Sequence, residues 1–273
     1  MKRDWLKAAF QEDFADPGDV TGEAIFSNET NSFVLISKDD GVLCGIDEFQ
    51  NVFTAVDSSI KIKSFFADSD LLKKGDVIAE ITGMVSAILK AERTALNIIS
   101  HLSGIASKTA EFVKAADGKS IILDTRKTLP GWRELQKYAV RCGGGQNHRM
   151  GLFDMVMIKD NHIDTAGGIT QAVQKIRNKW KNRFKIEVET RNLQEVKEVL
   201  ECGVDRIMLD NMDNETMKTA VEIIAGKAEV EASGNMTLER IPEVAETGVD
   251  FISVGELTQS VKAFDFSLKK KSF

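Results

Sequence analysis

The sequence predicts an α/β fold: a reduced or open β/α barrel of about six parallel strands, joined to an N-terminal α+β layer domain. From about residue 120 onward, short β-branched runs alternate with capped helical stretches that end at glycine. The late strand ends fall at 189, 210, about 233 and 255, and this spacing of 21 to 23 residues is typical of a β/α period. A full eight-stranded barrel takes about 250 residues, whereas this repeat occupies only about 140 to 150. A doubly wound sheet is the alternative.

Residues 1–105 are predicted to form the N-terminal domain, because short strand-like runs there are separated by DDG and KKGD turns and followed by a long helix from about Ala87. The run KAFDFSL near the C-terminus alternates like a strand. We therefore expect residues 262–273 to pair with the N-terminal sheet. The remaining residues, 106–261, are predicted to form the catalytic domain.

Six strands are predicted in the catalytic domain, each ending in a polar residue or glycine. They are SIILD, MVMIK, KIEVE, RIMLD, EVEAS and FISVG, which end at Asp124, Lys159, Glu189, Asp210, Ser233 and Gly255. Helices follow the third, fourth and fifth strands, with Asn192, Asn214 and Thr237 as predicted start signals. In such folds the functional groups gather where loops leave the carboxyl ends of the strands.

The composition excludes several classes of protein. There are 36 Lys and Arg against 42 Asp and Glu, a net charge of -6, which argues against a chain-wide surface for nucleic acid or anionic membrane. No apolar run approaches the roughly 18 to 20 residues of a membrane span, and the start, MKRDWLKAAFQEDF, lacks a signal-peptide core. We expect a cytoplasmic protein whose three cysteines are reduced and mostly buried.

Cationic side chains concentrate in residues 123–162 of this acidic chain, which predicts a binding site for a small, multiply anionic ligand. They are Arg126, Lys127, Arg133, Lys137, Arg141, His148, Arg149 and Lys159. Arg133 and Lys137 fall on a predicted helix, so we expect them to be solvated helix charges. The run of three glycines at 143–145 could let backbone approach a ligand or could form only a flexible turn.

Glu189 and Asp210 offer the oxygen ligands that Mg²⁺ prefers, although a carboxylate at a strand end can also cap the next helix. The sequence has no HExxH motif, no Cys/His cluster and no GxSxG elbow. Structural zinc and a serine hydrolase are therefore disfavoured.

Long motifs in this region resemble those of one known family. They are AERTALN, LSGIA, LDTRKTLPG, YAVRCGGGQNHRMGLFDMVMIKDNHI, IEVE, IMLDNM, EASGN and ISVGELT, in order over most of residues 91–258, with weaker matches at GDVT and DDGVLCG. The chain is similar to the quinolinate phosphoribosyltransferases, also called carboxylating nicotinate-nucleotide pyrophosphorylases. The resemblance implies Mg²⁺-dependent phosphoribosyl transfer from phosphoribosyl pyrophosphate to quinolinate with decarboxylation, giving nicotinate mononucleotide, pyrophosphate and CO₂ in de novo NAD biosynthesis. It also implies a homodimer, and a higher oligomer remains an alternative. Neither nucleic acid nor membrane is expected as a partner.

Carried over by position, the resemblance assigns quinolinate binding to Arg126, His148, Arg149 and Lys159, with Arg93 contributed by the other subunit. It assigns phosphoribosyl pyrophosphate binding to Lys127, Glu189, Asp210, Ser233, Gly234, Asn235 and Gly255, and Mg²⁺ to Glu189 and Asp210. From spacing alone Arg93 is an ordinary helix charge.

The sequence departs from the family pattern at Leu129, at Thr190 and Arg191, and at Glu256 and Gln259, the last two near the expected phosphate site. A related protein linked to molybdate transport is a rival, but the intact KDNH run at 159–162 argues against it. A non-catalytic sensor of an anionic metabolite is the rival from another class.

Overall fold

The computed structural model describes residues 4–271, and these residues pack as two units. Unit 1 contains residues up to 110, residues 129–144 and residues from 260 onward, whereas unit 2 contains residues 111–128 and 145–259. The domain limits expected from the sequence stay a prediction, and their outermost residues, 1–3 and 272–273, lie outside the described part of the chain.

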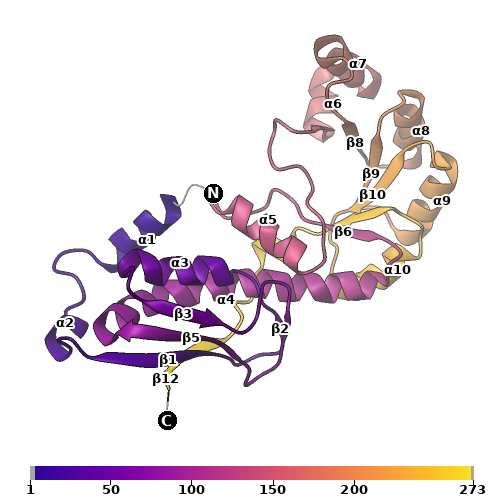
Figure 1. The fold of residues 1–273 in the computed structure, drawn as a ribbon. Helices are drawn as coiled ribbons and strands as arrows, with labels where there is room; N and C mark the ends of the chain where they lie inside the picture. The colour runs from indigo at the N-terminus through magenta and orange to yellow at the C-terminus, as the bar shows by residue number, and fades with distance from the viewer. Residues whose placement is uncertain (1–3, 272–273) are drawn as a thin grey trace. The chain divides into compact units, whose positions relative to one another are not determined.

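Unit 1 is built on a four-stranded antiparallel sheet in the order β12-β1-β5-β3, coloured indigo to magenta with β12 in yellow (Figure 1). Its strands are β1 (Thr30–Ser37), β3 (Lys61–Ser64), β5 (Val77–Met84) and β12 (Phe266–Lys270), and β2 (Gly41–Val42) pairs separately with β4 (Leu71–Leu72). β12 pairs with β1 in a register that places Leu268 opposite Leu35. The alternating C-terminal run therefore joins the N-terminal sheet.

Among the described residues, unit 1 also contains five helices. They are α1 (Asp4–Asp13), α2 (Gly22–Ile25), α3 (Ile46–Val56), the 32-residue α4 (Val85–Ala116) and α5 (Arg133–Cys142), and α4 continues into unit 2. On α3, Phe49, Val52 and Phe53 share one helical face because they are three and four residues apart, and all three are fully buried.

Unit 2 is a six-stranded parallel sheet in the order β6-β11-β10-β9-β8-β7. The strands are β6 (Ile121–Leu123), β7 (Val156–Ile158), β8 (Ile186–Thr190), β9 (Arg206–Asp210), β10 (Glu229–Ser233) and β11 (Phe251–Ser253). β6 and β7 form its two edges, so the sheet is open. The predicted fold class is confirmed.

Among the described residues, six helical segments lie between these strands: α6 (Asp160–Ala166), α7 (Ile169–Trp180), α8 (Leu193–Glu201), α9 (Asn214–Ile224), the 3-10 helix η1 (Leu238–Arg240) and α10 (Ile241–Ala245). A seventh, α11 (Glu256–Gln259), follows β11. Asn192 caps α8 as predicted, because its side chain accepts the backbone N–H groups of Gln194 and Glu195. The cap predicted at Asn214 was wrong by one residue. Asp213 caps α9 instead and accepts the N–H of Thr216.

Within the described residues, no helix is both long enough and apolar enough to span a lipid bilayer.

Candidate active site

Unit 2 carries a cavity of about 730 Å³ at the carboxyl ends of its parallel strands. Strands β6, β7, β9, β10 and β11 contribute residues at or just beyond their last positions, because these ends meet at one edge of the sheet. Most of the residues expected from the sequence line it: Arg126, Lys127, His148, Arg149, Lys159, Asp210, Ser233, Gly234, Asn235 and Gly255. Glu189 and Arg93 are outside this lining of described residues.

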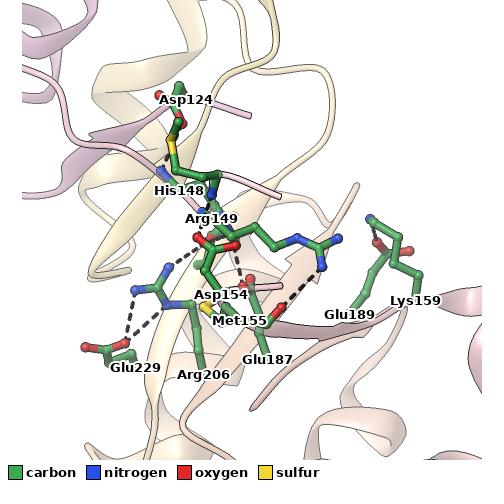
Figure 2. A network of polar contacts seen from close by, with 12 residues as sticks. Asp124, His148, Arg149, Asp154, Met155, Lys159, Glu187, Glu189, Arg206 and Glu229 are labelled. Carbon is green, nitrogen blue, oxygen red and sulfur yellow. Dashed lines mark hydrogen bonds and ion pairs between the residues drawn. The ribbon is translucent and has the colours of Figure 1, made fainter. Parts of the chain in front are cut away.

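Lys159 and Glu189 form an ion pair between adjacent strand ends, with Lys159 Nζ donating to Glu189 Oε2 (Figure 2). The two residues meet because β7 and β8 are neighbours with Ile158 opposite Val188. Glu189 is only 8% exposed, whereas Lys159 is half-buried and faces the cavity. The structure therefore joins two residues that the resemblance assigned to different substrates.

Asp124 anchors the segment that carries His148. Its Oδ1 accepts the backbone N–H of His148 at 2.9 Å, and its Oδ2 accepts Asn147 Nδ2 at 2.5 Å. The backbone of Gln146 also pairs with β6, donating to Ile122 O at 2.8 Å and accepting from Asp124 N at 3.1 Å. This fully buried strand-end carboxylate fixes the backbone beside the cavity.

The His148 imidazole lies against two buried glutamates. Its Nε2 is 3.0 Å from Glu187 Oε2 and 3.3 Å from Glu231 Oε2, and its Nδ1 accepts the backbone N–H of Arg149 at 2.7 Å. Burial lowers the pKa of His148, but the two carboxylates outweigh burial and raise it to about 9. The Arg149 hydrogen bond opposes this shift because Nδ1 must keep its lone pair. In the neutral form of the ring, the proton is therefore on Nε2.

Glu187 and Glu231 have no exposed surface and differ in their charge partners. Arg206 Nη1 donates to Glu231 Oε2 at 3.0 Å, and its other nitrogens reach Glu229 Oε2 at 3.0 and 3.2 Å (Figure 2). Burial would raise the pKa of Glu231, but the adjacent His148 ring and the charge of Arg206 lower it. Burial and the charge of Glu231 raise the pKa of Glu187 to about 7. Glu187 is thus the carboxyl group that holds a proton near neutral pH.

Glu187→Gln is expected to change how stability depends on pH. Glu187 has a folded-state pKa of about 7, above its unfolded value of about 4.3, so the native protein binds the extra proton between these values. The free energy of unfolding of the wild type should therefore fall, relative to the variant, by up to about 3 kcal/mol as pH rises from 4.5 to 7. Urea unfolding across this range measures the difference. A constant difference would mean that Glu187 is ionised in the folded state.

Arg149 and Arg126 bring two guanidinium groups to the same part of the cavity. Arg149 Nη1 donates to Met155 O at 3.3 Å, and Asp154 shapes the intervening loop by accepting the N–H groups of Met150 and Gly151 at 2.6 and 3.0 Å. Burial and the charge of Arg126 lower the pKa of Arg149. Two guanidinium groups that repel each other favour a ligand with more than one carboxylate.

A second corner of the cavity is made of backbone at the ends of β9 and β10. Asn211, Gly234 and Asn235 adopt left-handed φ values of 53°, 93° and 49°, and Asn211 N–H donates to Ser233 O at 2.9 Å. Asn211 Nδ2 donates to Asp210 Oδ2 at 2.8 Å, and Asn235 Nδ2 donates to Asn211 Oδ1 at 3.1 Å. Short polar side chains and glycine are the residues that tolerate this conformation.

Gly234→Ala is expected to lower turnover at least tenfold, because a Cβ there would lie 2.3 Å from Asn211 Oδ1 in addition to the backbone strain. Gly226→Ala is the matched control, since Gly226 has a φ of 73° but no atom within 4 Å of its added Cβ. Each substitution should cost about 1–2 kcal/mol of stability from backbone strain. Only Gly234→Ala should reduce turnover in steady-state assays. Equal turnover of the two variants would show that this corner takes no part in the reaction.

Lys127 lies over Gly255. A Cβ on Gly255 would be 3.0 Å from Lys127 Cδ, and Thr258 donates its hydroxyl to Lys127 O at 2.7 Å. The loop after β6 is thereby fixed to the start of α11. Glu256 and Gln259, two departures from the family pattern, also line the cavity at this point.

The other departures lie elsewhere. Thr190 is buried and donates its hydroxyl to Met208 O, Arg191 pairs with Glu195, and Leu129 is 49% exposed in unit 1. Arg93 lies on the exposed face of α4 in unit 1.

Lys137 contradicts its sequence interpretation. It is fully buried on α5, together with Leu135, Gln136 and Ala139, and is not a solvated helix charge. The buried residues of α5 include polar and charged side chains as well as apolar ones. A prediction of exposure from side-chain type alone was therefore wrong at Lys137.

Glu187 and Glu231 are two buried charged residues beside the site that the sequence interpretation did not single out. Each lies two positions before a strand-end candidate, Glu189 and Ser233 respectively. Because side chains alternate along a strand, positions two apart share a face. Charged residues inside the otherwise apolar runs IEVE and EVEA were the available signal.

Known proteins match this chain over nearly its whole length. Residues 19–103 match the family described as quinolinate phosphoribosyl transferase, N-terminal domain, and residues 105–269 match its C-terminal domain. A chloroplastic nicotinate-nucleotide pyrophosphorylase [carboxylating] of Oryza sativa subsp. japonica is 45% identical over 97% of this chain and 76% of the relative. A probable nicotinate-nucleotide pyrophosphorylase [carboxylating] of Bacillus subtilis (strain 168) is 42% identical over 96% and 91%.

The fold is also similar to that of a solved structure, NadC from Streptococcus pyogenes. The TM-score is 0.94 and the identity 42%, with 98% of this chain and 95% of that chain covered.

Proposed function

The chain belongs to the quinolinate phosphoribosyltransferase family, and we propose that the reaction of this family takes place in the cavity of unit 2. The protein is an enzyme, a carboxylating nicotinate-nucleotide pyrophosphorylase. It transfers a phosphoribosyl group from phosphoribosyl pyrophosphate to quinolinate with decarboxylation, as a step of NAD biosynthesis.

One observation carries the placement of the site: four cationic side chains face the same cavity as a strand-end carboxylate. Arg126, Lys127, Arg149 and Lys159 line it together with Asp210. Both substrates are multiply charged anions, so clustered cations supply binding energy and orientation. We propose that Arg126, His148, Arg149 and Lys159 bind quinolinate.

The backbone corner of Ser233, Gly234 and Asn235, together with Lys127 and Gly255, is proposed to hold phosphoribosyl pyrophosphate. Backbone amides and a lysine ammonium are common ligands of phosphate oxygens. Glu189 is proposed to act on the same substrate, and its contact with Lys159 links the two binding regions.

In the first chemical step, the pyridine nitrogen forms a bond to C1 of the ribosyl group as the bond from C1 to the pyrophosphate oxygen breaks. Arg149 and Lys159 orient the ring by its carboxylates, and the Lys127 ammonium faces the departing pyrophosphate. The Asp210 carboxylate opposes the positive charge that develops on the ribosyl group. Orientation and charge stabilisation therefore account for most of the expected acceleration.

In the second step, the bond from C2 to its carboxylate breaks, and the electron pair is stabilised by the quaternised ring nitrogen. CO₂ leaves, and C2 takes up a proton from solvent water. The guanidinium groups of Arg126 and Arg149 keep the remaining carboxylate in place.

The Asp210 carboxylate also fits a magnesium ion. It lines the cavity, and one or two carboxylates combined with substrate phosphates are the oxygen donors that Mg²⁺ prefers. We propose that Asp210 holds Mg²⁺ with Glu189 as the second acidic residue, although Glu189 Oε2 already accepts the Lys159 ammonium. Bound Mg²⁺ would neutralise charge on the pyrophosphate leaving group.

Asp210→Asn is expected to lower turnover about a hundredfold, because it deletes a charge that faces the transition state while keeping the shape of the side chain. Quinolinate affinity should change little. The control is Asp213→Asn, since Asn is an equally good helix cap and Asp213 lies outside the cavity lining. The turnover of the two variants is compared in steady-state assays at saturating Mg²⁺. Normal turnover of Asp210→Asn would show that Asp210 does not stabilise the transition state.

The assignment of the whole site is tested with quinolinate labelled in its 2-carboxylate. Labelled CO₂ and nicotinate mononucleotide should form only when phosphoribosyl pyrophosphate and Mg²⁺ are both present. A folded protein that binds quinolinate without turnover would support the sensor instead.

A homodimer with Arg93 contributed across the interface is part of the proposal, as is a cytoplasmic location. Arg93 is exposed on α4, so its side chain is accessible to a second copy of the chain. Cell fractionation tests the location, for which the plant relatives differ, being named chloroplastic or mitochondrial.

A further inference from the structure

Two cysteines lie together in unit 1, in a part of the molecule that the proposed reaction does not use. Cys44 comes just before α3, and Cys142 is the last residue of α5. Their Sγ atoms and a carboxylate oxygen of Asp68 all lie within 4.8 Å of one another. Cys44 is fully buried, whereas Cys142 is half-buried, so a reagent from solution can reach only Cys142.

Both cysteines are anchored on α4. The backbone N–H of Cys44 donates to Ser103 Oγ at 3.0 Å, and the Ser103 hydroxyl also lies 3.1 Å from Cys44 O. Next to Cys142, a Cβ on Gly143 would lie 2.3 Å from Ala106 O, so this backbone packs directly on the helix. The two sulfur atoms are therefore kept close by a shared rigid element.

Three polar side chains stabilise the thiolate form of Cys142. They are Cys44, Ser69 and Tyr138, and in this order they lower the pKa of Cys142, against burial, to about 7. The interaction between the two cysteines, with burial, raises the pKa of Cys44. The pair is thus asymmetric, with an accessible thiolate beside a buried thiol.

A metal site is the competing interpretation of this cluster, and the contacts of Asp68 disfavour it. Asp68 Oδ1 already accepts the N–H groups of Gly45 and Ile46 at 2.8 and 3.0 Å, and Oδ2 accepts the Tyr138 hydroxyl at 2.8 Å. Structural zinc sites almost always have four protein ligands, whereas only three candidate ligands meet here among the described residues.

We propose that Cys142 and Cys44 form a redox-active dithiol that small disulfides oxidise. The Cys142 thiolate attacks one sulfur of the disulfide, forming a mixed disulfide and releasing one thiolate. Cys44, after losing its proton, attacks the Cys142 sulfur, forms the Cys44–Cys142 disulfide and releases the second thiolate. Two protein thiols are oxidised, and one small disulfide is reduced to two thiols.

The test treats the Cys202→Ser protein, which keeps only this pair, with glutathione disulfide at pH 7. The intact mass should fall by two hydrogen atoms, and a non-reducing peptide map should join Cys44 to Cys142. Dithiothreitol should reverse both changes. The same map of the wild type, which retains Cys202, gives the result without any substitution.

Two variants separate the steps. In the Cys202→Ser background, Cys44→Ser should stop at one glutathionyl group on Cys142, and Cys142→Ser should remain unmodified. Tyr138→Phe should slow the reaction of Cys142 severalfold, because it removes one of the polar groups that stabilise the thiolate. Wild-type protein that keeps free thiols at both positions, or that carries glutathione on Cys142 without passing it to Cys44, would overturn the proposal.

Discussion

Arg149→Ala is expected to weaken quinolinate binding by a factor between about thirty and several thousand while leaving the affinity for phosphoribosyl pyrophosphate nearly unchanged. Removing one partner of a desolvated charge pair costs about 2 to 5 kcal/mol. Arg149 is half-buried in the cavity, and its own protein partner is a neutral carbonyl, Met155 O, at 3.3 Å. Its charge is therefore available for a substrate carboxylate. Calorimetric titration with each substrate measures the two affinities.

The matched control for this experiment is Arg191→Ala. Arg191 is exposed, pairs with Glu195 at 2.8 Å and lies outside the cavity lining, so its loss removes the same charge from another place. Quinolinate affinity should be unchanged in this control. The same result for Arg149→Ala would remove Arg149 from the quinolinate site.

Arg93→Ala and Lys159→Ala homodimers are each expected to be nearly inactive, and mixing them should restore activity towards about a quarter of wild type. Half of randomly paired dimers carry one intact site of two if Arg93 enters the neighbouring subunit. A solvated helix charge predicts a different outcome, a change of no more than about 0.5 kcal/mol in stability and normal turnover of Arg93→Ala. Assays before and after subunit exchange distinguish the two.

A second mixture controls for exchange itself. Arg149 and Lys159 line the cavity of one chain, so a mixture of Arg149→Ala and Lys159→Ala leaves one lesion in every site and should recover nothing. Native mass spectrometry verifies that subunits have exchanged. Verified exchange of Arg93→Ala with Lys159→Ala and no recovery would place Arg93 within its own chain or outside the site.

The sequence was most informative where period and residue type agreed. Asp210, Ser233 and Gly255 lie at the ends of parallel strands, so a β/α period of 21 to 23 residues was enough to bring them to one edge. The open form of the sheet followed from the short length of the repeat. The alternation of strands and helices depends on residues close together in the sequence, so it can be predicted from short segments.

Partnerships between side chains were not predictable in this way. The Lys159–Glu189 pair depends on which strands are neighbours, and the burial of Lys137 depends on what packs around α5. Strand order and tertiary packing arise from distant parts of the chain. Local residue patterns therefore predict neither the strand order nor the packing around a helix.

The strand order also bears on synthesis at the ribosome. β12, residues 266–270, occupies the edge of a sheet whose other strands all precede residue 85, and β11 separates β6 from β10 in the second sheet. The second sheet cannot be completed before β11 (Phe251–Ser253) has been translated, nor the first before β12 (Phe266–Lys270). Until then the nascent chain must keep the outer edge of β1 unpaired, and such edges invite pairing with other chains. Emergence of residues 251–270 from the exit tunnel is thus the event that closes both sheets.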